Sequence, residues 1–481
     1  MLPVSAAVLE SVPRRVASAA VGLALASVLL AGAVQRPGHA WAATPQVSFP
    51  YGEGRCGPAE LKYIEELPVL FVEGHPAQLG RQSAKLVGTP ARQLVEYPRR
   101  LLAEIGLADR FPRLVAQGQR LLPQFPPQHL AELEAFAHTA GLDRDLLVGV
   151  NTMVDVYRGG LGCSSLLVEA RRSKTGKPLF GRNLDFYSLG ILQKYSLVIV
   201  CRPDGKHAFC SVGFPGMVGC LSGMNEAGLA VAVHEVLLAG DGAPLFDPRG
   251  VPYTLLLRRV LEECRTVDEA ERLVRAAGRT TLFNLALCDS QQARVLEVTP
   301  RTVAVRRPER GLLACTNHFR SPELRTLLRF SWRYQALWES QALARLDVPD
   351  IAQKLHEVHQ GPMTLQTMVF EPAAMRLHVA IGASPATALP LRTLDLRVLF
   401  RGKRSRHTPS AARPVENPGP GCPRGVWRDG ARWSIIDADT ANAPRRAGRQ
   451  QGPPVRSASS THNVKSLRRC SDECLAPINA P

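Results

Sequence analysis

The 481-residue chain has a hydrophobic fraction of 45%, which is enough for a full core, and its length suits one large layered α/β unit with tails. Its formal net charge is +17, but residues 401–481 hold 15 Lys and Arg against 6 Asp and Glu, so +9 of the charge falls in this tail. The remaining +8 is diluted over some 400 residues without a basic helix or an aromatic-basic repeat. This distribution argues against nucleic-acid binding.

The first predicted element is an export signal. Arg14 and Arg15 precede an apolar run over residues 16–34, and Ala-Trp-Ala at 40–42 has the small-x-small pattern of a cleavage site. A membrane anchor is the alternative, because the run approaches the length needed to span a bilayer. The cleavage pattern favours removal. We therefore expect 1–42 to be a signal peptide and the mature protein to be extracytoplasmic, either periplasmic or secreted, without stable membrane insertion.

The next segment, 43–162, has a mostly helical pattern. Apolar residues recur at helical spacing over 61–67, 80–107 and 127–140. The sequence therefore predicts a helical segment that precedes the glycine-rich stretch around Cys163 and wraps the later core.

Cys163 opens a predicted β-hairpin. A short apolar strand follows it at 166–168, a turn occupies 173–178, and the returning strand runs over 178–186. This hairpin brings Arg182 and Asp185 back beside Cys163. A buried structural cysteine next to a solvated ion pair would produce the same local pattern, so the hairpin alone does not establish a site.

Beyond residue 190, strands and helices alternate. A capping box predicts that the helix over 254–275 restarts after Cys264, and Ser321 followed by proline predicts another helix running to about 346. Past residue 400 the composition shifts to Arg, Pro, Gly and Ser, which predicts a disordered tail over 401–481. The predicted strands share short apolar runs, at 195–200, 207–212, 229–233, 283–287, 294–298, 302–305, 312–316 and 377–381.

The chain contains 11 cysteines, an odd number that leaves at least one thiol unpaired within an exported molecule. Cys201 with Cys210, which flank a turn, and Cys470 with Cys474 are candidate disulfides in an oxidising compartment. No Cys-x-x-Cys pair occurs, so a structural zinc site is not expected. No metal, nucleotide or flavin motif stands out either, and we expect no cofactor.

Several separate motifs over about residues 65–385 resemble one enzyme family. They are Gly-Cys-Ser-Ser at 162–165, Gly-Arg-Asn-Leu-Asp at 181–185, Gly-Met-Asn-Glu-Ala-Gly-Leu-Ala at 223–230, Thr-Asn-His-Phe at 316–319 and Ser-Trp-Arg-Tyr at 331–334. The set is similar to the N-terminal-nucleophile (Ntn) hydrolases of the acyl-coenzyme A:6-aminopenicillanic acid acyltransferase type, relatives of acid ceramidase and choloylglycine hydrolase. The resemblance implies an α+β fold, a four-layer αββα sandwich, with 163–400 as the catalytic core.

The resemblance also implies a mechanism. Cleavage between Gly162 and Cys163 would free an α-amine that serves as the base for the Cys163 thiol, and the two resulting chains would stay together as a heterodimer. Asp185 is then suited to bind the α-ammonium, and Arg182 to favour the thiolate or hold a substrate oxygen. Asn317 takes the role of oxyanion donor.

Two further residues have less certain roles in this scheme. Arg333 either returns a cation to the site or is an ordinary surface residue of its helix. His234 stands where relatives often carry an asparagine, so the second oxyanion donor is either His234 or a backbone N–H group.

Three functions fit these motifs. The first is a secreted Ntn enzyme that hydrolyses a linear amide, or transfers its acyl group, through an acyl-cysteine thioester. The second is a Cys-His hydrolase without self-cleavage, in which Cys163 pairs with His318 or His234. The third is a binding protein that kept the fold without activity. The substrate stays open among N-acyl amino acids, lipid amides, β-lactams and peptides.

Overall fold

The computed structural model describes residues 47–327 and 331–401. The predicted signal peptide, most of the predicted tail and the candidate Cys470–Cys474 disulfide lie outside these residues. Across the described part of the chain, no helix combines the length and the apolar character needed to cross a membrane.

Two β-sheets form the centre of the molecule. The first is ten-stranded, in the order β1-β2-β3-β6-β7-β8-β9-β10-β11-β12, and the second is six-stranded, in the order β13-β4-β5-β14-β15-β16. Strands of the first sheet are β1 Gly54–Cys56, β2 Ala59–Ile64, β3 Leu67–Gly74, β6 Leu197–Pro203, β7 Phe209–Gly213, β8 Ser222–Asn225, β9 Ala230–Glu235, β10 Phe283–Cys288, β11 Ala293–Val298 and β12 Val303–Arg306. Strands of the second sheet are β4 Leu161–Val168, β5 Leu179–Phe186, β13 Leu312–Cys315, β14 Thr364–Glu371, β15 Arg376–Ile381 and β16 Arg392–Asp395.

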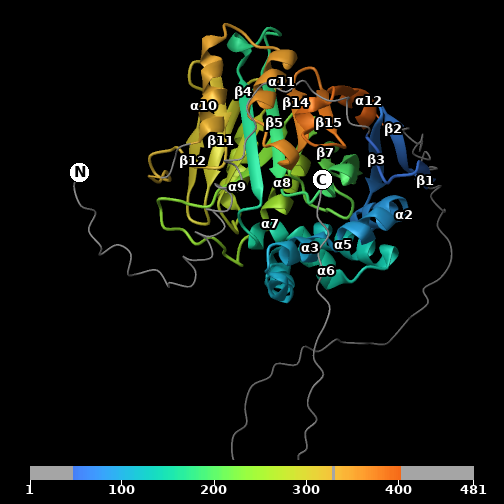
Figure 1. Ribbon diagram of the computed structural model, residues 1–481. Helices are drawn as coiled ribbons and strands as arrows, with labels where there is room; N and C mark the ends of the chain where they lie inside the picture. Colours follow the sequence, from blue (N-terminus) through green and yellow to red (C-terminus); the bar gives the residue numbers. More distant parts are fainter. Residues whose placement is uncertain (1–46, 328–330, 402–481) are drawn as a thin grey trace, which may run out of the picture. The chain divides into compact units, whose positions relative to one another are not determined.

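Helices cover the outer faces of both sheets. The helices that precede Cys163 are α2 Pro76–Leu94, α3 Tyr97–Glu104, α4 Phe111–Gln119, α5 Pro127–Ala140, α6 Arg144–Asn151 and α7 Met153–Val156. The later helices are α8 Tyr253–Glu263, α9 Val267–Ala276, α10 Trp332–Trp338, α11 Val348–Glu357 and α12 Leu396–Phe400. In Figure 1 the blue and cyan helices lie in the lower part of the view, whereas α10 and α11 lie at the top.

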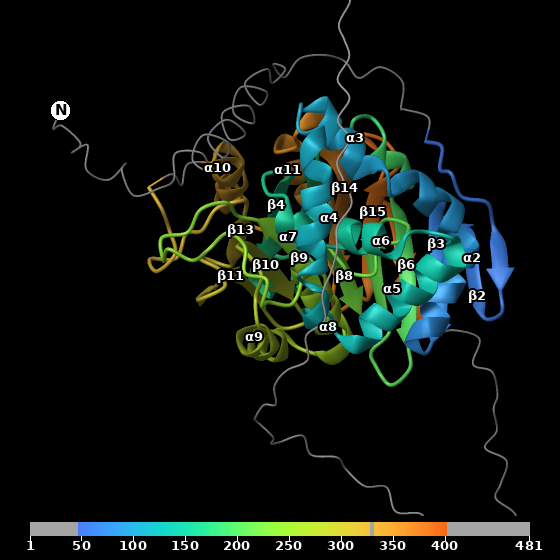
Figure 2. The same cartoon turned by 90° about the horizontal axis from the view of Figure 1, so that it is seen from below.

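Buried apolar clusters separate the molecule into four layers. One cluster lies between the sheets and joins Val198 of the first sheet to Phe180 of the second. A second cluster packs the other face of the first sheet against α5 and α8, and a third packs the second sheet against α10 and α11. The predicted α+β class and the αββα layering are therefore confirmed, and Figure 2 shows the helical layer with α4, α5 and α6 in front of the sheets.

The alternation of side chains along β4 shows how the sequence produces this layering. Leu166 and Val168 face the cluster beneath α10 and α11, whereas Leu167 faces the cluster between the sheets. Successive side chains of a strand point to opposite faces, so a continuous apolar run such as 166–168 suits a strand that is covered on both sides.

The segment before Cys163 is joined to the rest of the fold in two ways. Strand β3 pairs in parallel with β6, with Val69 opposite Val198. On the helical side, Arg258 of α8 donates to Glu132 of α5 over 2.6 Å, and both side chains are buried. The backbone ladder and the buried ion pair thus tie residues that lie far apart in the sequence.

The helix predicted over 61–67 is wrong, since these residues form β2, a turn and the start of β3. Glu65 and Glu66 both adopt positive φ angles, 49° and 64°, and Ile64 pairs with Leu67. Positive φ at both central residues is typical of a two-residue hairpin turn. The turn lacks the Asn-Gly signature that would have revealed it, so the segment before Cys163 is only partly helical.

The helix predicted from Ser321 is also wrong at its start. The backbone N–H groups of Arg320 and Ser321 donate to the buried Glu297 carboxylate over 2.8 Å each. These two hydrogen bonds fix residues 320 and 321 in a turn that is separate from α10. Helix α10 begins later, with Ser331 as its cap. By contrast, the predicted restart of the helix after Cys264 is confirmed, because the Thr266 side chain accepts from the Glu269 N–H at the start of α9.

The candidate disulfide between Cys201 and Cys210 does not form. The register of β6 against β7 places Cys201 opposite Phe209 and Val200 opposite Cys210. Cys201 therefore faces the helical cluster and Cys210 the cluster between the sheets. The eight cysteines of the described residues are all free thiols.

The packing between the sheets predicts the effect of removing one ring. Phe180 is fully buried with its ring 5.5 Å from that of Phe370. We expect Phe180→Ala to lower the free energy of unfolding by about 3–5 kcal/mol, because the cavity cannot refill between two sheets. Urea denaturation measures this value, and Val398→Ala, at a side chain that is 62% exposed, is the control. Equal values for the two variants would contradict the packing described above.

Candidate active site

The hairpin predicted around Cys163 is present as β4 and β5. Gly162 lies opposite Asp185, Cys163 opposite Leu184 and Ser165 opposite Arg182. Because side chains alternate, Cys163 and Arg182 lie on one face of the hairpin and Asp185 projects from the other. The register thus surrounds the cysteine with a guanidinium on one side and a carboxylate on the other.

Both backbone groups of Cys163 are held by side chains from a distant segment. Its N–H donates to Asn317 Oδ1 over 2.7 Å, and its carbonyl oxygen accepts from Arg333 Nη1 over 2.7 Å. Arg333 Nη2 also donates to Asn317 Oδ1 over 2.9 Å. Arg333 is therefore a part of the site and not a surface residue of its helix.

The Asn317 amide spans the peptide bond that precedes Cys163. Its Nδ2 donates to the carbonyl oxygens of Leu161, over 3.1 Å, and Glu235, over 2.9 Å. Its Oδ1 accepts from two N–H groups, so the orientation of the amide is fixed by four bonds. One of the two acceptors of Nδ2, the Leu161 carbonyl, therefore lies on the amino side of the Gly162–Cys163 bond.

Three side chains surround the Asp185 carboxylate with hydrogen-bond donors. Thr364 Oγ1 donates to Oδ1 over 2.6 Å, Gln360 Nε2 donates to Oδ2 over 2.8 Å, and Arg333 Nη1 lies 3.6 Å from Oδ2. Burial raises the pKa of the Asp185 carboxyl, while Arg333 and the two hydrogen bonds act in the opposite direction. The carboxylate is thus prepared to accept a cation near Cys163.

Arg182 is buried on the thiol side of the hairpin. Its Nε donates to Ser222 Oγ over 2.5 Å and its Nη1 to the Asn183 carbonyl over 2.7 Å, whereas Nη2 has no hydrogen-bond partner among the described residues. Burial raises the pKa of the Cys163 thiol, and the Arg182 guanidinium opposes this rise. The sulfur is therefore a neutral thiol, and Arg182 Nη2 is a donor without a hydrogen-bond partner on the same face of the hairpin.

The two candidate histidines have other partners. His234 Nε2 lies 2.8 Å from Ser165 Oγ, and burial lowers the pKa of its ring well below the usual range. His318 Nδ1 lies 3.0 Å from Thr316 Oγ1, and burial lowers its pKa to about 4. Among the hydrogen bonds of the described residues, none joins either imidazole to Cys163.

Glu235 positions the segment that leads into Cys163, a role that the sequence did not predict. Its carboxylate accepts from the N–H groups of Gly159, over 3.0 Å, and Leu161, over 2.9 Å, and lies 3.1 Å from Arg158 Nε. The sequence singled out its neighbour His234 and not Glu235 itself. Gln360, Thr364 and Ser222 were missed as well, because no local pattern links them to residues some 40 to 180 positions earlier.

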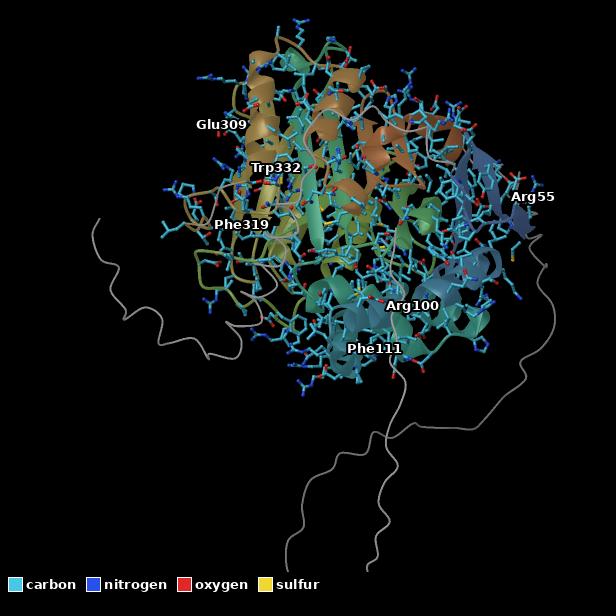
Figure 3. All side chains as sticks on the ribbon, in the orientation of Figure 1. Arg55, Arg100, Phe111, Glu309, Phe319 and Trp332 are labelled. Carbon is cyan, nitrogen blue, oxygen red and sulfur yellow. The ribbon has the colours of Figure 1, made fainter. Side chains whose placement is uncertain are left out.

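In the part of the chain that the structure describes, no group of three or more His, Cys, Asp or Glu side chains is placed to hold a metal ion. Helix α10, whose first residue Trp332 is labelled in Figure 3, packs against β13 and β4.

The glycine at 162 is required by close approach to Gln360. A Cβ at this position would lie 2.1 Å from Gln360 Nε2 and 3.3 Å from the Asp185 Cβ. We expect Gly162→Ala to push the Gln360 amide away from Asp185 and to lower the free energy of unfolding by about 1–3 kcal/mol. Chemical denaturation tests this in a Cys163→Ala background, in which Gly162 stays joined to the following residue, with the exposed Gly52→Ala, where a Cβ meets nothing within 4 Å, as the control. Unchanged stability of Gly162→Ala would show that Gln360 does not hold Asp185.

Comparison with known proteins gives matches to the predicted family. The family model for acyl-coenzyme A:6-aminopenicillanic acid acyl-transferase matches residues 171–384, a stretch that begins after Cys163. The acyl-coenzyme A:6-aminopenicillanic-acid-acyltransferase 40 kDa form of Emericella nidulans is 25% identical over 214 residues, which are 43% of this chain and 56% of that protein. The N-acylethanolamine-hydrolyzing acid amidase of Oryctolagus cuniculus is 27% identical over 194 residues, 37% of this chain and 49% of that protein.

Among solved structures, the N-acylethanolamine-hydrolyzing acid amidase ortholog of Caenorhabditis elegans matches with a TM-score of 0.36 and 16% identity, over 48% of this chain and 100% of that one. The chain spans about half the length of the curated relatives it matches. The resemblance found in the sequence is confirmed, and over residues 171–384 this chain is similar to the acyl-coenzyme A:6-aminopenicillanic acid acyl-transferase family.

Proposed function

We propose that this protein is an exported, self-processing amidohydrolase that cleaves a linear amide through a thioester on Cys163. The observation that carries the proposal is the hydrogen bond of 2.7 Å from the Cys163 N–H to Asn317 Oδ1, with Asp185 and Arg333 beside it. These contacts provide a prepared environment for a free α-amine at this position. The family match after Cys163, and relatives named as an acyltransferase and an amidase, support the same chemistry.

Self-cleavage supplies the base that the thiol requires. The Cys163 sulfur attacks the Gly162 carbonyl carbon, the Gly162–Cys163 C–N bond breaks, and the thiol proton goes to the departing nitrogen. Water then hydrolyses the thioester, which leaves a Gly162 carboxylate and a free Cys163 thiol. The new α-amine has an ordinary pKa of about 8, close to working pH, whereas a histidine base is absent from the contacts of Cys163.

The same groups then act on the substrate. The α-amine takes the thiol proton as the sulfur attacks the amide carbonyl, and it returns this proton to the leaving nitrogen as the amine departs. Water attacks the acyl thioester and releases a carboxylic acid. Arg182, through its free Nη2, favours the thiolate, and Asp185 holds the α-ammonium that forms during each step.

Asn317 changes its task once the chain is cut. In the uncut chain its Nδ2 donates to the Leu161 carbonyl, which belongs to the segment that cleavage releases. The released N–H group is then free to donate to the oxyanion of the tetrahedral intermediate. The second oxyanion donor is a backbone N–H group in this proposal, because His234 is engaged by Ser165.

Hydrolysis is the outcome that we propose over acyl transfer. The thioester accepts either water or an amine, but coenzyme A thioesters are scarce outside the cytoplasm, where the predicted signal peptide at 1–42 would send the protein. A Cys-His hydrolase is less well supported, because a His318 pKa of about 4 leaves no imidazolium near neutral pH to stabilise a thiolate. An inactive binding protein does not require the arrangement of Arg182, Asp185 and Asn317 around a thiol.

Self-cleavage is tested by the masses of the purified chains. We expect the mature protein to consist of two chains, the larger beginning at Cys163, and Cys163→Ala to remain a single chain, because alanine has no nucleophile. Intact-mass spectrometry measures both. Replacement of the neighbouring Cys315, which is also buried and free, by alanine is the control and should leave cleavage intact. Active wild-type protein in one uncut chain would reject self-cleavage and favour the Cys-His alternative.

The proposed oxyanion donor is tested by Asn317→Ala. We expect turnover of a cleavable N-acyl amide by the cut form to fall about 100-fold to 1000-fold, the usual loss for one such donor. Rates are normalised to the cut fraction, so that slower self-cleavage is counted separately. Asn225→Ala is the matched control, since Asn225 Nδ2 also donates to two carbonyls, those of Leu261 and Cys264, but on β8. A change of less than several-fold in Asn317→Ala would make this residue purely structural.

A further inference from the structure

A serine of the first sheet is hydrogen-bonded to the guanidinium on the thiol side of the hairpin. Ser222 lies on β8, is fully buried, and its Oγ accepts from Arg182 Nε over 2.5 Å. Cys163 and Arg182 belong to the second sheet, through β4 and β5. The bond therefore crosses from one sheet to the other and ends at the face of the hairpin that carries the sulfur.

Arg182 carries a buried charge that no carboxylate neutralises. Its side chain is fully buried, and none of the ion pairs of the described residues includes it. Arg258, which is also buried, instead forms ion pairs with Glu132 and Glu262. A buried charge needs an ion of opposite sign or hydrogen bonds to neutral groups. The orientation of the Arg182 guanidinium therefore depends on neutral acceptors.

Only one of these acceptors lies outside the strand that carries Arg182. Nη1 donates to the carbonyl of Asn183, the next residue of β5, so this bond moves with the strand. Among the described residues, Ser222 is the single side chain that accepts from Arg182. Because the guanidinium is planar, acceptors at Nε and Nη1 fix its plane and with it the direction of Nη2.

The imidazole on the same side of the hairpin does not take over this task. His234 Nε2 lies 2.8 Å from Oγ of Ser165, which is opposite Arg182 in the hairpin. Burial lowers the pKa of His234 well below its usual range, and the charge of Arg182 acts in the same direction. The ring is therefore neutral and bonded to Ser165, which leaves the guanidinium to Ser222.

We propose that Ser222 is a positioning residue for the reaction and holds the Arg182 guanidinium so that its unpartnered Nη2 favours the thiolate of Cys163. This inference rests on the function proposed above and adds a residue of the first sheet to it. Ser222 acts through Arg182, so its removal should change the ionisation of the thiol and leave substrate binding as it is.

The test removes the hydroxyl group and follows the thiol. In cut Ser222→Ala we expect the apparent pKa of Cys163 to be about 0.5–1 higher and alkylation by iodoacetamide below that pKa to be about 3-fold to 10-fold slower, because a pKa difference of one changes the thiolate fraction tenfold. The mass of the peptide that contains Cys163 gives the rate across a pH series. In the same variant, kcat for an N-acyl amide should fall in proportion, with KM within about 2-fold.

Further variants separate positioning from a loss of packing. Ser222→Thr keeps the acceptor and should retain the wild-type pH profile. Ser222→Cys, with a weaker acceptor, should give a smaller rise in the thiol pKa, and it replaces Ser222→Ala if alanine prevents folding. Ser196→Ala is the matched control, because the buried Ser196 Oγ also accepts from a buried side chain, Gln366 Nε2, over 3.1 Å, and its loss should not change the thiol pKa.

The coupling of Ser222 to Arg182 is measured in an Arg182→Lys background. Lysine lacks the Nε–H group, so Ser222→Ala should add no further change there, as expected for two residues that act together. Full additivity would overturn this inference alone, and so would an unchanged or lower thiol pKa in Ser222→Ala or an equal rise in Ser196→Ala.

Self-cleavage gives an independent outcome, because it starts from the same sulfur. A Ser222→Ala chain that stays uncut supports the inference if Ser222→Thr restores cleavage, and contradicts it if Ser222→Thr also stays uncut. Wild-type protein in which Cys163 neither begins a chain nor is alkylated at any pH would overturn the proposed function instead.

Discussion

The register of β4 against β5 is the constraint on which the candidate site depends. With Gly162 opposite Asp185 and Ser165 opposite Arg182, the guanidinium falls on the thiol face and the carboxylate on the face beneath α10. A slip by one residue would exchange these faces and separate both charges from Cys163. The apolar run at 166–168 suits both buried faces and does not select the register. The residues before it do, because only a glycine at position 162 leaves room for the Gln360 amide opposite Asp185.

The polar side chains around Cys163 differ in how completely their hydrogen-bonding groups are paired. Asn317 and Asp185 are fully engaged by neighbours, so their positions are fixed before any reaction. Arg182 keeps a buried Nη2 without a partner in the described part of the chain. A buried unpaired donor costs about 1–3 kcal/mol, a cost that would be offset by negative charge on the adjacent sulfur, as the proposed function requires.

The sequence predicted those parts of the fold and site that depend on local pattern. Periodicity and capping residues predicted the hairpin at Cys163, most later strands and the α9 cap. A family resemblance supplied the candidate site residues. The Glu65-Glu66 turn was missed because its conformation contradicts residue preference. The late start of α10 was missed because Glu297, distant in sequence, binds the turn at Ser321. Gln360 and Thr364 were missed because only the folded chain brings them to Asp185.

The parallel pairing of β3 with β6 determines how a backbone break near β4 would affect the fold. The residues before Gly162 supply β1, β2 and β3, which cover what would otherwise be an open edge of the ten-stranded sheet at β6. An exposed strand edge is a template for pairing with other chains. A nick in the backbone near β4 therefore leaves a continuous ladder between the two pieces, and loss of the smaller piece would leave the larger one prone to aggregation through Leu197–Pro203.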